Sequence, residues 1–145
     1  MVVCIFGESC TGKSTIASSL KDVLKADVYT GRDYLRLAKN EQIARNAFQT
    51  KLQNAVAGEN IIYVVAEKEH LALVPDGAVR VLVTADLACI LQRFAQRMKG
   101  TLPPPVKQML EKKHGMFDAY AYDFRVHNSE NIADLCGAIV QMQGK

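Results

Sequence analysis

The sequence predicts an α/β fold in which a five-stranded parallel sheet is covered by helices on both faces. Short apolar runs alternate with longer segments whose apolar residues recur at helical spacing. The run at 61–65 is apolar throughout, which is typical of a strand buried on both faces of a parallel sheet. At the start of the chain, a strand candidate at 2–6, a glycine-rich loop and a helix candidate at 14–24 follow one another directly. Such alternation predicts this fold class.

The glycine-rich loop fits the phosphate-binding pattern G-x-x-x-x-G-K-[ST] at every fixed position. Its glycines allow a tight turn, and its amides can form an anion-binding nest at the start of the helix. In such a loop Lys13 bridges the β- and γ-phosphates of ATP, and the Ser14 hydroxyl holds Mg²⁺. The predicted nucleotide-binding residues are Gly7, Glu8, Ser9, Cys10, Thr11, Gly12, Lys13, Ser14 and Thr15.

The chain then continues with a strand and two helices before the apolar run at 61–65. Residues 26–30 form a short strand candidate that ends at Gly31. A short helix is expected over 32–40 and a longer one over 41–56. The apolar face predicted for the longer helix comprises Ile43, Ala47, Phe48, Leu52 and Val56.

The second half supplies two more strands and three more helices. The strands are expected at 79–84 and 123–126. Three consecutive prolines stiffen a loop at 99–105. The helices are expected at 86–98, 106–120 and 131–142.

Length and composition indicate one cytoplasmic domain that spans residues 1–145. The net charge of +3 is too small to predict nucleic-acid binding, and no apolar run reaches membrane-spanning length. Because a strand candidate begins almost at the first residue, we expect no signal peptide. The four cysteines show neither metal-binding nor disulfide spacing. We therefore expect a small-molecule partner, no nucleic-acid or membrane partner, and an open oligomeric state.

Polar residues follow the second strand candidate, where ligands of parallel sheets bind. Thr30, Asp33 and Arg36 provide a hydroxyl, an acid and a base at one edge of the predicted nucleotide site. We expect Arg36 to bind a phosphate of the second substrate, with Thr30 beside it. Asp33 would orient that substrate or join the metal shell, and it is the best candidate base for a hydroxyl acceptor. A helix cap with a solvated ion pair is the structural alternative.

Arg93 and Arg97 lie four residues apart, on one helix face just before the proline loop. Guanidinium groups in such a place can neutralise charge on a phosphoryl group in transfer. The segment at approximately 98–115 is basic and resembles a mobile lid that excludes water. A solvated basic face is the alternative.

The segment after the third strand departs from expectation for a phosphate-binding loop protein. It contains no Asp to hold magnesium through water, so either Glu67 or Asp33 replaces it or catalysis is poor. His70 has no cysteine or second histidine near it in sequence, and we interpret it as a surface or packing residue.

Together these segments resemble the nucleoside monophosphate kinase superfamily of P-loop proteins. Residues 30–36, T-G-R-D-Y-L-R, are similar to the T-G-D-x-x-R segment of adenylate kinases, with Arg32 inserted where that family places its Asp. The second half looks closest to cytidylate-kinase-like proteins, through 61–73, 79–85, Arg93, Arg97, Glu111-Lys112-Lys113 and 122–128. The resemblance implies a P-loop NTPase three-layer sandwich with strand order 2-3-1-4-5.

The resemblance also implies roles for particular residues. Residues around Asn128 and Ser129 would border the adenine of ATP, and Lys13, Arg93 and Arg97 would act in phosphoryl transfer. Two departures are Ala66-Glu67 after the third strand and the lack of an arginine after the lid. Lys112 and Lys113 stand there instead, and lysine lacks the bidentate fork of arginine.

The sequence therefore predicts a small kinase that uses ATP and Mg²⁺, with a nucleoside monophosphate as the expected acceptor. A nucleoside or metabolite kinase is one alternative, and a degenerate nucleotide-binding regulatory module is another. A GTPase lacks support, because the chain contains no N-K-x-D string and no D-x-x-G after the third strand.

Overall fold

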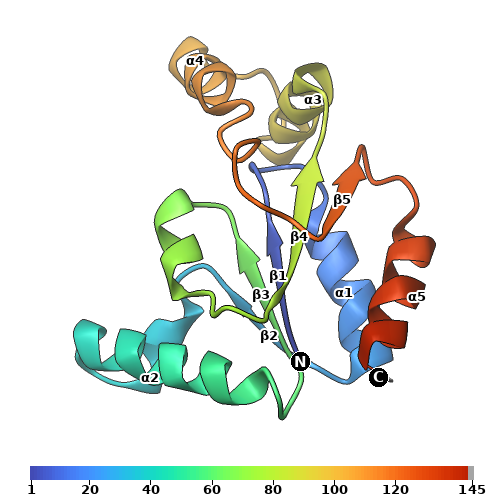
Figure 1. Cartoon of the computed structure of the whole chain (residues 1–145). Coiled ribbons are helices and arrows are strands. Elements are labelled where there is room, and N and C mark those ends of the chain that lie inside the picture. Colours follow the sequence, from blue (N-terminus) through green and yellow to red (C-terminus); the bar gives the residue numbers. More distant parts are fainter. Residues whose placement is uncertain (144–145) are drawn as a thin grey trace.

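The computed structural model describes residues 1–143 and contains a five-stranded sheet in the order β2-β3-β1-β4-β5 (Figure 1). Every paired strand is parallel to its neighbour. The predicted fold class and strand order are thereby confirmed, and the carboxyl ends of all strands meet at one edge. The strands are β1 (Val2–Phe6), β2 (Asp27–Thr30), β3 (Ile61–Val65), β4 (Val79–Thr84) and β5 (Phe124–His127).

Helices cover both faces of the sheet and also extend beyond its carboxyl edge (Figure 1). On one face lie α1 (Lys13–Leu24) and α5 (Ile132–Gln143). On the other lie α2 (Glu41–Ala55) and the 3₁₀ helices η1 (Asp33–Leu37) and η2 (Lys68–Leu73). The projecting helices are α3 (Leu87–Arg97) and α4 (Pro104–Lys113).

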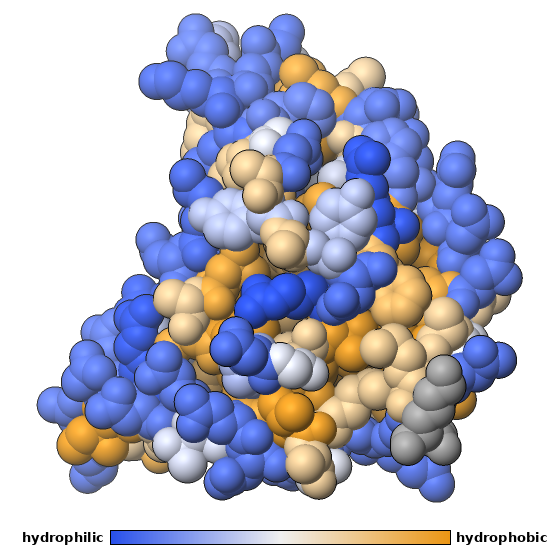
Figure 2. Space-filling view, in the orientation of Figure 1, coloured by the Kyte–Doolittle hydropathy of each residue, from blue (hydrophilic) through white to orange (hydrophobic). Residues whose placement is uncertain are grey.

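The core consists mainly of two apolar layers, because successive side chains of a strand point to opposite faces of the sheet. Within β1, Cys4 and Phe6 belong to the layer beneath α2, whereas Val3 and Ile5 belong to the layer beneath α1 and α5. Both layers exclude water from the strand, which explains why β1 is apolar at every position. The projecting end around α4 is predominantly hydrophilic (Figure 2). No helix in residues 1–143 has the length and apolar character needed to cross a membrane.

Some predicted elements differ in extent. The helix expected over 106–120 begins at Pro104, where the fixed φ of proline suits a first turn, and ends at Lys113. Gly115 follows with a φ of 80°, a left-handed conformation that a continuing helix cannot adopt. The helix expected over 32–40 is only the five-residue η1.

The buried face of α2 is rotated from the predicted one. Ile43 is 60% exposed, whereas Ala44 and Phe48 are completely buried. Ala47 is also exposed. The expectations for Ile43 and Ala47 were wrong because apolar residues beside the buried stripe satisfy the same approximate spacing.

Candidate phosphate-binding cleft

A cleft of about 700 Å³ lies at the carboxyl ends of β1, β2 and β3. The phosphate-binding loop and α1 form one wall, and residues that follow β2, β3 and β5, together with two arginines of α3, form the rest. It is lined by Ser9, Cys10, Gly12, Lys13, Ser14, Thr15, Thr30, Gly31, Arg32, Val64, Ala66, Glu67, His70, Arg93, Arg97 and Ser129. Thus six of the nine predicted loop residues reach the cleft, while Gly7, Glu8 and Thr11 lie outside its lining.

Close approaches in the loop explain its two glycines. A Cβ atom on Gly7 would lie 2.2 Å from the carbonyl oxygen of Val83 in β4. Gly12 has a φ of 100°, and a Cβ atom there would lie 2.5 Å from Oγ of Ser129. Any side chain at either position would therefore collide with a neighbouring strand or loop.

Lys13 is the first residue of α1, and its buried side chain points its ammonium group at the backbone of the loop. Its Nζ donates to the carbonyl oxygen of Glu8 and lies 3.5 Å from Oγ1 of Thr11. Burial is the main reason that the pKa of Lys13 is lowered to about 8, and the nearby charge of Arg97 lowers it further. The negative charge of a phosphate in the cleft would favour the protonated ammonium group and so oppose both effects.

The two predicted arginines of α3 both line the cleft. Arg93 donates from Nη1 to the carbonyl oxygen of Cys10 at 3.1 Å, which ties α3 to the loop. Cys10 adopts a φ of 63°, which bends the loop at this point. The structure therefore brings Lys13, Arg93 and Arg97 together around one space.

The three site residues predicted after β2 do not all line the cleft in the structure. Thr30 lines the cleft, whereas Asp33 and Arg36 are absent from its lining. Asp33 accepts a hydrogen bond from the backbone N–H of Thr30 at 2.9 Å and thus stabilises the turn. The guanidinium carbon of Arg36 lies 4.5 Å from the ring centroid of Tyr29. The roles predicted for Asp33 and Arg36 stay predictions.

Three other side chains that follow β2 and β3 line the cleft. Arg32 precedes η1 and pairs with Glu41 at 3.3 Å, and Glu67 follows β3 at 4.0 Å from Lys113. His70 lies on η2 and is only 7% exposed. The sequence signal for His70 is its place just after β3, at the ligand-binding edge of the sheet.

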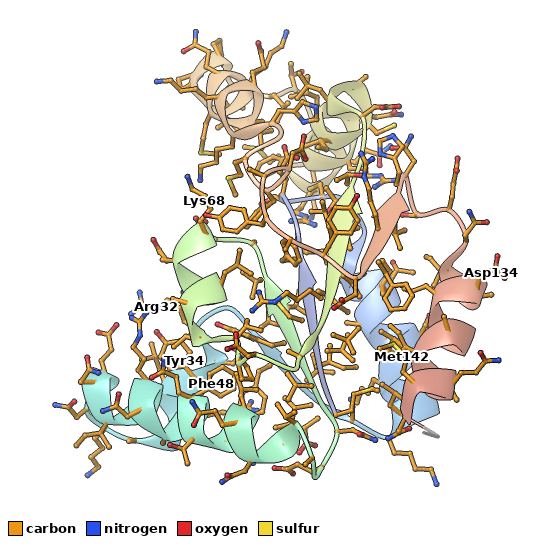
Figure 3. All side chains as sticks on the ribbon, viewed as in Figure 1. Arg32, Tyr34, Phe48, Lys68, Asp134 and Met142 are labelled. Carbon is orange, nitrogen blue, oxygen red and sulfur yellow. The ribbon has the colours of Figure 1, made fainter. Side chains whose placement is uncertain are left out.

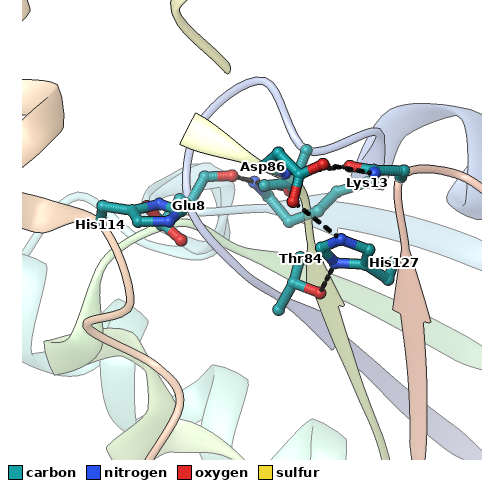
Figure 4. A network of polar contacts seen from close by, with 8 residues as sticks. Glu8, Lys13, Thr84, Asp86, His114 and His127 are labelled. Atoms are coloured by element: carbon teal, nitrogen blue, oxygen red, sulfur yellow. Dashed lines mark hydrogen bonds and ion pairs between the residues drawn. The ribbon is translucent and has the colours of Figure 1, made fainter. Parts of the chain in front are cut away.

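Beyond the loop, a polar network joins the ends of β4 and β5 (Figure 4). The His127 ring lies between Oγ1 of Thr84, 2.8 Å from Nδ1, and Oδ1 of Asp86, 3.2 Å from Nε2. Asn128 exchanges two hydrogen bonds with Asp86. Hydrogen bonds from Asn128 and then His127 lower the pKa of Asp86. Asn128 lies outside the cleft lining, but its neighbour Ser129 reaches it, so the predicted adenine contact stays a prediction.

A second polar contact joins the segment after α4 to the loop (Figure 4). Nδ1 of His114 lies 3.0 Å from Oε1 of Glu8, and that glutamate is buried. The expected lid is therefore in contact with the phosphate-binding loop, although its mobility stays a prediction.

The residues present fit magnesium bound mainly through a nucleotide. Ser14 is exposed and lines the cleft, so its hydroxyl could be a ligand. Within residues 1–143 no three His, Cys, Asp or Glu side chains cluster as a metal site. Mg²⁺ commonly takes most of its ligands from phosphates and water, which agrees with this arrangement.

Comparison with known proteins shows the fold. No protein-family model matches the sequence, and no curated protein sequence matches it. Among solved structures, shikimate kinase from Acinetobacter baumannii in complex with shikimate is similar over 97% of this chain and 91% of its own, at 13% identity and a TM-score of 0.63. A sugar kinase from Janibacter sp. is similar over 97% of this chain and 92% of its own, at 12% identity and a TM-score of 0.61.

A gluconokinase from Sinorhizobium meliloti is similar over 94% of this chain and 87% of its own, at 11% identity and a TM-score of 0.58. These structures support the general P-loop kinase fold expected from the sequence, without singling out cytidylate or adenylate kinases.

Proposed function

We propose that this protein is an ATP-dependent kinase that phosphorylates a hydroxyl group of a small metabolite. The observation that carries the proposal is the convergence of Lys13, Arg93 and Arg97 on one cleft that also reaches the ends of β2 and β3. A phosphoryl donor on the loop and an acceptor over β2 and β3 would then share one space.

The cleft residues can perform the transfer by positioning and electrostatics. The loop amides and Lys13 hold the β- and γ-phosphates, and Arg93 and Arg97 neutralise charge on the transferring group. An oxygen of the acceptor hydroxyl bonds to the γ-phosphorus while the bond to the β–γ bridging oxygen breaks. ADP leaves with that bonding pair, and the hydroxyl proton passes to water. Mg²⁺ held by Ser14 and the phosphates would supply further positive charge.

A hydroxyl acceptor agrees better with the structure than the nucleoside monophosphate expected from the sequence. The phosphate-binding role expected of Arg36 has no support from its position, because its side chain stacks on Tyr29 and is absent from the cleft lining. Two of the structural neighbours are named as kinases of shikimate and of gluconate, both of which carry hydroxyl groups.

The proposal is tested by acceptor-dependent ADP release from ATP and Mg²⁺. The panel contains ribose, gluconate, shikimate, nucleosides, AMP and CMP. We expect turnover with a hydroxyl compound, and a loss of about a thousandfold in kcat/KM in the double variant Arg93→Ala, Arg97→Ala. Arg125→Ala, which removes an exposed arginine of β5, is the control and should retain activity.

Other outcomes point to the alternative functions. Turnover with AMP or CMP alone would support a monophosphate kinase. ATP binding that depends on Lys13, without turnover on any acceptor, would instead support a regulatory nucleotide-binding module.

A further inference from the structure

We propose that His70 binds the acceptor through a hydrogen bond to its imidazole ring, on the β2–β3 side of the cleft. The inference rests on the proposed function and identifies a residue that selects the acceptor. Nδ1 of His70 is the one buried side-chain nitrogen or oxygen without a hydrogen-bond partner in the described part of the chain.

An unpaired buried polar atom destabilises a fold, so its presence requires an explanation. His70 is 93% buried by its neighbours, yet it belongs to the lining of the cleft. An apolar residue of similar size would fill the same space without the cost of an unpaired nitrogen. Binding of a ligand with hydroxyl groups is a function that an apolar residue could not perform.

The imidazole is held in place by a rigid support. Its backbone N–H donates to the carbonyl oxygen of Glu67 at 3.2 Å, which closes a 3₁₀ turn directly after β3. The Tyr34 ring meets the imidazole edge to face, with 6.4 Å between the ring centroids. The Tyr34 ring also stacks on Phe48 (Figure 3). A preorganised ring loses little conformational entropy when it binds a ligand.

The surroundings of His70 suit a hydroxylated carbon skeleton. Three polar side chains also line the cleft on the side of β2 and β3. They are the hydroxyl of Thr30, the guanidinium of Arg32 and the carboxylate of Glu67. Val64 and Ala66 contribute apolar surface at the same place. Directional polar groups beside apolar surface can fix the orientation of a small hydroxylated molecule.

Three variants test the proposal. His70→Phe keeps an aromatic ring against Tyr34 but removes both nitrogens, His70→Gln retains a hydrogen-bonding group, and Glu69→Gln alters an exposed residue of η2 as a control. We expect His70→Phe to raise the KM for the acceptor about tenfold, with less than a twofold change in the KM for ATP. It should also raise Tm by about 3 °C, because an unpaired buried atom is lost.

The conservative variant separates binding from packing. We expect His70→Gln to recover part of the acceptor affinity, and Glu69→Gln to match the wild type. An unchanged acceptor KM in His70→Phe would overturn the proposal. So would a marked fall in its Tm, since that would mean that the ring nitrogens stabilise the fold.

Histidine NMR distinguishes this proposal from the proposed function. The chain has three histidines, so the His70 signal can be assigned by its loss in His70→Gln. Wild-type protein loaded with ADP is titrated with ribose, gluconate and shikimate, with His114 and His127 as internal references. A selective His70 shift without any turnover would retain the binding proposal and reject the kinase. Turnover without a His70 shift, and without a change in the acceptor KM of His70→Phe, would retain the kinase and reject the binding proposal. The absence of both turnover and shift would reject both.

Discussion

At the residue scale, the burial of charged Lys13 lowers the stability of the fold, whereas the same charge is expected to strengthen phosphate binding. Its pKa is lowered to about 8 in the fold from 10.5, chiefly by burial. Between these pH values the unfolded chain binds more protons, so Lys13 makes stability rise with pH in that window. Below pH 8 Lys13 is charged in the fold, and its burial then lowers the free energy of unfolding by its full amount, at most about 3 kcal/mol.

We therefore predict that Lys13→Met is more stable than the wild type at pH 7 and loses this advantage as the pH approaches 10.5. The same substitution should weaken ATP binding about a hundredfold, because a charged phosphate contact is lost. Thermal unfolding across this pH range and ATP titration measure both effects. Lys21→Met, on the exposed part of the same helix, is the control. If Lys13→Met and the wild type differed in Tm by the same amount at pH 7 and at pH 10, the explanation would be contradicted.

At the scale of the element, the orientation of α2 is decided by packing against the sheet. Phe48 contacts the rings of Tyr29, Tyr34 and Tyr63, with ring centroids between 4.9 and 5.6 Å apart. Phe48 is completely buried, whereas Ile43 on the same helix is 60% exposed. Two apolar residues of one helix thus have very different environments.

We predict that Phe48→Ala lowers the free energy of unfolding by about 3–5 kcal/mol, because it leaves a cavity among aromatic rings. Ile43→Ala should change it by less than about 0.5 kcal/mol. Urea unfolding of the two variants gives both values. Comparable losses would mean that Ile43 is part of the core after all.

At the scale of the whole molecule, a nucleotide in the cleft would link elements that are distant in sequence. The loop after β1, the arginines of α3 and Ser129 after β5 all line this space. A ligand that contacts all of them stabilises only the folded state, in which they are assembled.

We predict that ATP with Mg²⁺ at a hundred times its Kd stabilises the protein by about 2.7 kcal/mol. This corresponds to a rise in Tm of roughly 10 °C. Removal of Mg²⁺ with EDTA should reduce the shift, because the loop would then face the phosphate charge without the metal. Thermal unfolding with and without EDTA provides the measurement. A shift that is the same in the Lys13→Met variant would place the nucleotide elsewhere.

The local pattern of apolar and polar residues was sufficient to predict most of the fold. The strands could be predicted because residues that are covered on both faces must be apolar at every position, as in β1 and β3. The ends of helices were less predictable, because α4 stops where the chain turns at Gly115 and not where its apolar spacing ends. The phase of α2 also depends on which side of the helix faces the sheet, which is a long-range property.

The sequence by itself determined the α/β class, the strands and the phosphate-binding loop, because each is encoded by neighbouring residues. Only the tertiary structure decided which side chains share the cleft. It places Arg93 and Arg97 beside Lys13, turns Arg36 onto Tyr29, and buries His70 with an unpaired nitrogen. These placements depend on contacts between segments far apart in the chain, and no local spacing of residues specifies them.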